Sequence, residues 1–184
     1  MSTESYPVLR QILADHVPEG WAIEFGVWSG ASLALIADYM PVIGLDSFQG
    51  LPEDWREGFP KGSFARDPDN LWGDKIPKIP LNAMLVEGWF EDTIPVLRAW
   101  GLPRIGLIHV DCDLYSSTKT VLDGMRDHIT PGCIVVFDEF HGYEGWENHE
   151  AKAWGEFVDE HRVIYRTLAT GAEERAFQIT SIGV

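Results

Sequence analysis

Apolar residues along the chain follow two spacings, one typical of strands and one typical of helices. Short, nearly continuous apolar runs predict strands at 21–27, 42–47, 82–89, 105–112 and 133–140. Apolar residues three and four positions apart predict helices at 7–15, 30–40, 92–100, 116–129 and 148–161, the fourth capped by Ser116 or Ser117. This alternation indicates an α/β domain with a mostly parallel sheet and helices on both faces.

Two more strand-like runs close the chain, at 163–169 and 176–182. The short segment TGAEER that separates them predicts an antiparallel hairpin. No repeat, low-complexity tract or linker divides the sequence, and 184 residues fall within the usual size of one domain. We therefore expect a single domain over residues 1–184.

The segment 51–81 interrupts the regular pattern. Its prolines prevent a long helix, although a short one could form at 67–72. An irregular stretch of this length is more often functional than accidental, so we expect a lid or an acceptor-binding insertion. The side chains that could line it are Trp55, Phe59, Lys61, Phe64, Arg66 and Trp72. A satellite apolar cluster under a long loop is an equally good interpretation of the aromatic residues.

The overall charge limits the classes of partner. The chain has 29 acidic and 14 basic residues, so its net charge is −15. This field repels phosphate backbones, and we expect no nucleic-acid partner. The apolar runs are too short to span a membrane, and the first residues lack the pattern of a signal peptide. With Cys112 and Cys133 in strand-like runs, these features predict reduced thiols and a cytoplasmic location.

In open α/β sheets the ligand binds beyond the carboxyl ends of the strands. After the first predicted strand, Gly26 and Gly30 allow a sharp turn and a close helix start, where Ser32 offers a hydroxyl group. Trp28 occupies the middle glycine position of the dinucleotide fingerprint, which argues against a nicotinamide or flavin dinucleotide. Asp46, after the second strand, is placed to accept hydrogen bonds from ribose hydroxyls. Together these residues favour a nucleoside ligand over a plain tight turn.

Carboxylates gather after two later strands. Asp111 and Asp113 follow one, and Asp138 and Glu139 follow another, which we expect to be its neighbour. Carboxylates this close raise one another's pKa unless a cation intervenes. An all-oxygen ligand set favours Mg²⁺ over Zn²⁺. A single such pair would be read as solvated loop acids, but two pairs at adjacent strand ends predict a metal site.

Three histidines near these acids have different expected roles. His141 could be a general base, a partner of the metal ligands or a surface residue. His109 lies in an apolar run, which is typical of a core histidine with satisfied hydrogen bonds. His149, between Glu147 and Glu150, is expected at a solvated helix start.

Five motifs occur in order along the chain: EFGVWSGAS (24–32), GLDSFQGLPEDW (44–55), VEGWFEDTIP (86–95), HVDCDLYSSTKTVLD (109–123) and PGCIVVFDEFHGY (131–143). They resemble the macrocin O-methyltransferase family of class I S-adenosylmethionine-dependent methyltransferases. The resemblance implies a Rossmann-like, seven-stranded sheet of order 3-2-1-4-5-7-6 that ends in an antiparallel hairpin. It also implies Mg²⁺-dependent methyl transfer from S-adenosylmethionine to a hydroxyl of a sugar, glycoside or other hydroxylated metabolite.

The same resemblance assigns roles to individual residues. The methyl donor would be held by Glu24, Phe25, Gly26, Gly30, Ser32, Asp46, Ser47, Gly88, Trp89 and Asp111. Mg²⁺ would be bound by Asp111, Asp138 and Glu139, and the base would be Asp113 or His141. The family usually has two aspartates where this chain has Asp138 and Glu139. The chain is also shorter than the antibiotic-sugar enzymes of the family, which makes their substrates a weak guide.

Two other functions are compatible with these residues. One is metal-independent N- or carboxyl-methylation with the same donor. The other is a non-catalytic module that binds S-adenosylmethionine, although such a module gains nothing from concentrated negative charge. The expected partner is a small hydroxylated acceptor, with no nucleic acid and no membrane, and a homodimer is also open.

Overall fold

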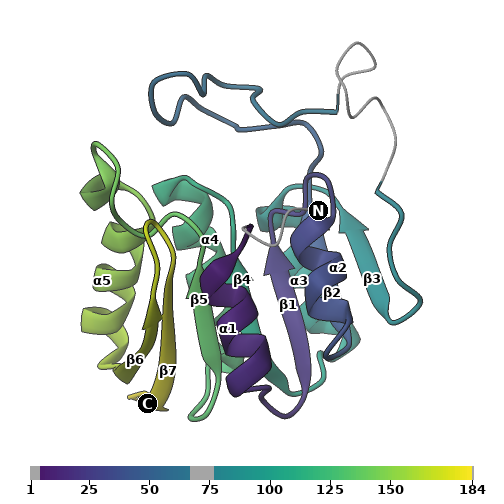
Figure 1. The fold of residues 1–184 in the computed structure, drawn as a ribbon, viewed down its shortest axis with the longest axis vertical. Helices are drawn as coiled ribbons and strands as arrows, with labels where there is room; N and C mark the ends of the chain where they lie inside the picture. Colours follow the sequence, from purple (N-terminus) through teal and green to yellow (C-terminus); the bar gives the residue numbers. More distant parts are fainter. Residues whose placement is uncertain (1–4, 67–76, 184) are drawn as a thin grey trace.

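The computed structural model describes residues 5–66 and 77–183. Seven strands form one sheet in the order β3-β2-β1-β4-β5-β7-β6, which confirms the predicted order (Figure 1). They are β1 (Trp21–Phe25), β2 (Val42–Asp46), β3 (Ala83–Glu87), β4 (Ile105–Val110), β5 (Ile134–Phe137), β6 (Ile164–Thr170) and β7 (Arg175–Ser181). β7 runs antiparallel to both β5 and β6, and β1 to β5 pair in parallel, so the C-terminal hairpin is also confirmed.

Helices cover both faces of this sheet. They are α1 (Pro7–Asp15), α2 (Ala31–Ala37), α3 (Phe90–Trp100), α4 (Tyr115–Met125) and α5 (Glu150–His161), with short 3₁₀ turns at Arg126–His128 and Trp146–Asn148. α1 and α2 pack on one face, while α3, α4 and α5 pack on the other (Figure 1). The segment that follows β2 passes over the carboxyl ends of the strands.

The start of α4 differs from the prediction. The residue that precedes the helix is Leu114, not Ser116 or Ser117, and no side chain caps it. Leu114 is buried in a small apolar cluster with Leu51, so tertiary packing fixes where the helix begins. The Ser116 hydroxyl is then free to donate a hydrogen bond to Glu53, at 2.6 Å. The short helix expected at 67–72 lies outside the described residues.

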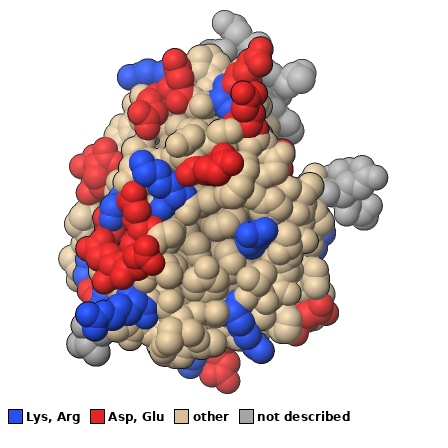
Figure 2. Space-filling view, turned by 90° about the vertical axis from the view of Figure 1, so that its left-hand side faces the viewer, with Lys and Arg blue, Asp and Glu red and all other residues tan. Residues whose placement is uncertain are grey.

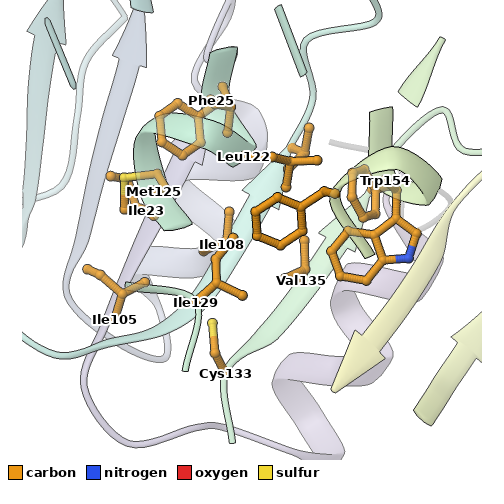
Figure 3. Close-up of a cluster of buried hydrophobic side chains, with 14 of the residues drawn as sticks. Ile23, Phe25, Ile105, Ile108, Leu122, Met125, Ile129, Cys133, Val135 and Trp154 are labelled. Atoms are coloured by element: carbon orange, nitrogen blue, oxygen red, sulfur yellow. The ribbon is translucent and has the colours of Figure 1, made fainter. Parts of the chain in front are cut away.

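Strand alternation divides the core into two layers. Ile23 and Phe25 of β1 point toward α3, α4 and α5, where Leu122 and Trp154 meet them in one continuous apolar cluster (Figure 3). The intervening β1 residues point toward α1 and α2. This alternation matters for the site, because it places Glu24 on the α1 face of the sheet although it lies between two core residues.

The larger layer depends on one aromatic stack. Trp154 is 2% exposed, and its ring is nearly parallel to that of Phe177, with centroids 5.3 Å apart. We expect Trp154→Ala to lower the free energy of unfolding by about 3–5 kcal/mol, because it leaves a cavity in close-packed surroundings. Urea denaturation measures this loss, with the exposed Val96→Ala on α3 as a control expected to change stability by less than about 0.5 kcal/mol. A W154A protein as stable as the wild type would contradict this account of the core.

The two cysteines lie in the core, as their apolar surroundings predicted. Cys112 and Cys133 are buried and form no disulfide, and burial raises the pKa of the Cys133 thiol to about 12. On the face over α5 and β6, acidic and basic side chains are interspersed (Figure 2). None of the helices in the described part of the chain has the length and apolar character needed to cross a bilayer.

Candidate functional site

A cavity of about 690 Å³ lies at the carboxyl ends of the central strands. Its volume is typical of sites for small molecules. The predicted site residues that line it are Gly26, Asp46, Ser47, Gly88, Trp89, Asp111, Asp113, Asp138 and Glu139. The loops after β1, β2, β3, β4 and β5 all contribute, so the cavity joins the predicted donor and metal regions.

Other predicted site residues lie outside this lining. Phe25 points into the core, where its ring contacts Phe90 edge-on, and Glu24 is buried on the opposite face of the sheet. Gly30 and Ser32 belong to the start of α2 and are not part of the lining. His141 also does not line the cavity. Strand alternation separates Glu24 and Phe25, which lie on opposite faces of the sheet.

Gly26 brings two loops into direct contact. Its φ is +92°, and a Cβ built on it would lie 1.7 Å from the main-chain oxygen of Asp111. The main chain of Asp111 in turn donates a hydrogen bond to the carbonyl of Phe25, at 2.9 Å. Only glycine allows this approach, and it fixes the position of Asp111 beside the end of β1.

Asp46 organises the same region through its carboxylate. One oxygen accepts hydrogen bonds from the N–H groups of Val27 and Trp28, both at 2.8 Å, and the other accepts one from Phe48, at 2.7 Å. A carboxylate offers about four acceptor positions. Asp46 therefore holds the loop after β1 in place and has room for about one hydrogen bond from a ribose, rather than the pair expected from the sequence.

The acids after β4 and β5 form one electrostatic unit. Burial and the neighbouring Asp138 raise the pKa of Asp113 to about 7. Burial, reinforced by the negative charge of nearby carboxylates, also raises the pKa of Asp111 and Glu139 well above their ordinary values. Burial removes the charged forms of these groups from bulk water, and their negative charges repel one another.

Glu150 is a further member of this unit that the sequence interpretation missed. It is fully buried, not part of a solvated helix start, and one of its oxygens accepts a hydrogen bond from the main chain of Glu139 at 3.3 Å. The signal was present in the spacing, because Glu150 precedes the buried Trp154 by four residues and Phe157 by seven. Those intervals place Glu150 on the inward face of α5.

The donor atoms in this unit suit a divalent cation. Single oxygens of Asp111, Asp113 and Glu139 lie within 4.8 Å of one another, and a second group within the same limit consists of His109, Asp111 and Asp138. Asp138 Oδ1 and Glu139 Oε2 are buried without a hydrogen-bond partner. An all-oxygen set with unsatisfied carboxylates fits Mg²⁺. The expected ligands Asp111, Asp138 and Glu139 are thus divided between two groups that share Asp111.

His109 lies in the core, as expected, but only one of its two ring nitrogens has a hydrogen-bond partner. Its Nδ1 lies 2.9 Å from Glu24 Oε1, and both side chains are fully buried. Burial alone would lower the pKa of His109, but the hydrogen bond and charge of Glu24 raise it above the ordinary value. Nε2 lies 3.9 Å from Asp138 Oδ1 and has no hydrogen bond. The expectation of a fully satisfied histidine is therefore wrong.

The described part of the 51–81 segment forms an apolar cluster that also borders the cavity. Trp55 packs with Leu51 and Leu114 in this cluster, and Arg56 lies over the Trp55 ring while pairing with Glu173 at 3.0 Å. Phe64 packs against the same cluster, and it also lines the cavity and contacts Trp28 edge-on, with ring centroids 5.6 Å apart.

The basic side chains in the described part of this segment do not line the cavity. Arg66 forms an ion pair with Glu87, and neither Arg66 nor Lys61 is part of the cavity lining. Trp72 lies outside the described residues. Among the described residues of this segment, those that line the cavity are Leu51, Pro52, Glu53 and Phe64.

The buried acids predict an unusual dependence of stability on pH. The pKa of Asp113 rises from 3.8 to about 7 on folding, so the folded state holds this proton over a pH range where the unfolded state has released it. With chelator present, we expect stability to fall as pH rises from about 4 to about 7. Thermal denaturation at several pH values measures this, and added Mg²⁺ should restore more stability near pH 7 than near pH 5. The slope should flatten in Asp113→Asn, and an unchanged slope would contradict the assignment.

Comparison with known proteins adds independent information. A family model described as "Methyltransferase domain" matches residues 23–140. A relative from Streptomyces olivaceus, an 8-demethyl-8-(2,3-dimethoxy-alpha-L-rhamnosyl)-tetracenomycin-C 4'-O-methyltransferase, is 29% identical over 157 residues, covering 72% of this chain and 57% of the relative. A demethyldecarbamoylnovobiocin O-methyltransferase from Streptomyces niveus is 25% identical, covering 72% of this chain and 56% of that protein. The chain thus spans little more than half the length of these relatives.

A solved structure is also similar over most of the chain. The calicheamicin methyltransferase CalS11 superimposes with a TM-score of 0.69 and 26% identity, and the match covers 93% of this chain and 76% of that one.

Proposed function

This chain belongs to the methyltransferase domain family, and from that premise we propose that it transfers a methyl group from S-adenosylmethionine to a hydroxyl of a sugar or glycoside. The name of the Streptomyces olivaceus relative specifies a rhamnosyl-bearing acceptor, and both relatives are named O-methyltransferases, which supports this class of acceptor. One observation carries the proposal. Gly26 and Trp89, expected beside the donor, line the same cavity as Asp111 and Asp113.

In this proposal, S-adenosylmethionine supplies a methyl carbon on a positively charged sulfur, and Mg²⁺ supplies positive charge near the reacting oxygen. Asp113 accepts the proton of the acceptor hydroxyl as the new C–O bond forms and the C–S bond breaks, leaving the electron pair on sulfur. Asp113 is a carboxyl group on the cavity wall, and a carboxylate there can serve as a general base. Asp113 is preferred to His141 as the base because Asp113 lines the cavity.

Other residues position the reactants. Asp111 and Glu139 would hold the ion, in the group that also contains Asp113. The Gly26 turn and the loop that Asp46 ties together form the donor side. Phe64 and Trp28 form an apolar wall that excludes water from the reacting atoms, which strengthens the electrostatic interactions within the cavity.

The direct test has two parts. Calorimetry should detect binding of S-adenosylmethionine and of S-adenosylhomocysteine to the folded protein. Formation of S-adenosylhomocysteine should then depend on a hydroxylated acceptor drawn from a panel of deoxysugar glycosides, and should stop when a chelator is added. Folded protein that binds neither nucleoside would contradict the proposal. Turnover that persists in chelator would instead favour the metal-independent alternative.

A further inference from the structure

The second group of metal-type donors includes a nitrogen that the proposed reaction does not use. His109 is fully buried, and its Nε2 has no hydrogen bond. Asp138 Oδ1, 3.9 Å away, is also buried and without a hydrogen-bond partner. One atom each from His109, Asp111 and Asp138 lies within 4.8 Å of the others. A nitrogen and two oxygens therefore converge, and the nitrogen and the Asp138 oxygen have no hydrogen-bond partner.

Glu24 fixes how this nitrogen is presented. Residues 24 and 109 are direct partners in the parallel pairing of β1 and β4, so the sheet register itself holds the two side chains together. Glu24 Oε1 lies 2.9 Å from Nδ1, and a carboxylate there accepts the Nδ1–H hydrogen bond. The lone pair of the neutral ring is then on Nε2, on the side of Asp138. A carboxylate behind a histidine in this way is the usual support of a metal-binding imidazole.

We propose that His109 Nε2, Asp111 and Asp138 form a binding site for a transition-metal dication such as Co²⁺, distinct from the all-oxygen group of Asp111, Asp113 and Glu139. Imidazole nitrogen suits later first-row transition metals, whereas Mg²⁺ prefers oxygen ligands only. The inference goes beyond methyl transfer, because it concerns metal selectivity and requires neither donor nor acceptor.

The competing role for His109 is that of a charged group paired with Asp138. The distance of 3.9 Å is too long for a hydrogen bond, so a protonated Nε2 would leave a buried donor unsatisfied. A cation between the two side chains satisfies both and neutralises the carboxylates. The two roles differ in what they predict for metal binding, which makes them separable.

The experiment uses the full chain, stripped of metal by chelation, with Co²⁺ and Mg²⁺ as separate probes and no nucleoside present. In the wild type, bound Co²⁺ should give a paramagnetically shifted, solvent-exchangeable proton resonance from the ring N–H of a coordinated histidine. In His109→Asn we expect this resonance to be absent and the Co²⁺ affinity to fall by at least about ten-fold. The Mg²⁺ affinity, measured by calorimetry, should change much less.

Two further variants make the test decisive. Glu139→Gln alters the all-oxygen group alone, so it should weaken Mg²⁺ binding and keep the shifted resonance. Glu24→Gln leaves His109 in place but weakens its support, and should lower Co²⁺ affinity to an intermediate degree. If H109N does not fold, the wild-type resonance and the Co²⁺ affinity of E24Q still test the proposal. Wild-type protein that binds Co²⁺ without the resonance, or H109N that loses Co²⁺ and Mg²⁺ affinity equally, would overturn the proposal and leave His109 as a positioning residue. These outcomes are independent of whether the chain transfers methyl groups.

Discussion

Asp113→Asn is expected to lower the rate constant for methyl transfer by about 10²–10⁴-fold while leaving donor binding essentially unchanged. An amide has nearly the shape of the carboxyl group, but it cannot take up the proton that the hydroxyl group of the methyl acceptor releases. Asp113 lies on the cavity wall, on the side of the acids rather than in the loops after β1 and β2 that would hold the donor. The loss should therefore fall on kcat and not on the affinity for S-adenosylmethionine.

The substitution also suits the backbone. Asp113 has a φ of +65°, in the left-handed region that asparagine tolerates better than most residues. Initial rates and calorimetric donor binding are the measurements. The matched control is Asp159→Asn, the same change at an exposed position of α5 outside the cavity, which should keep wild-type rates. A D113N protein that turns over as fast as the wild type would remove Asp113 as the base.

Gly26→Ala is expected to lower the free energy of unfolding by about 2–4 kcal/mol and to weaken donor binding by at least about ten-fold. The left-handed φ of Gly26 disfavours any side chain. The added methyl group would also overlap the main-chain oxygen of Asp111, and backbone atoms cannot move aside as a flexible side chain can. Relief of this overlap must push Asp111 away from the end of β1, so stability and the site are disturbed together.

Gly101→Ala separates these two effects. Gly101 follows α3 with a φ of +84°, and a Cβ there would meet no atom within 4 Å. Gly101→Ala should therefore lower the free energy of unfolding only through the strain of the left-handed backbone, by about 1–2 kcal/mol. Donor binding should be intact. Denaturant unfolding and calorimetry on both variants give the comparison. If the two variants lost equal stability and both bound donor normally, the close approach at Gly26 would have no functional importance.

The architecture and the acid cluster followed from local patterns. Apolar spacing located every strand and helix to within a few residues in the described part of the chain, because burial on one or two faces imposes a period on each element. The convergence of Asp111, Asp113, Asp138 and Glu139 followed from topology, since parallel strands bring their carboxyl ends to one edge of the sheet. The strand order came from the motifs' resemblance to a known family.

The direction and partners of single side chains could not be obtained in this way. Asp46 was expected to accept hydrogen bonds from ribose hydroxyls, yet three main-chain N–H groups occupy most of its acceptor positions. Glu150 appeared solvated, yet α5 turns it inward toward Glu139. Such outcomes depend on which groups from distant parts of the chain compete for the same few hydrogen bonds, and a periodic pattern carries no information about that competition.

Glu24 and His109, two polar residues in apolar strands, show most clearly which features the sequence predicted and which depend on the folded sheet. The burial of His109 was expected from the apolar residues around it, because a strand inside a parallel sheet is covered on both faces. Its pairing with Glu24 was not, since it requires β1 and β4 to be neighbours in a register that sets residue 24 opposite residue 109. Only the folded sheet, with water excluded from both side chains, makes each the partner of the other and turns the second ring nitrogen toward the acids.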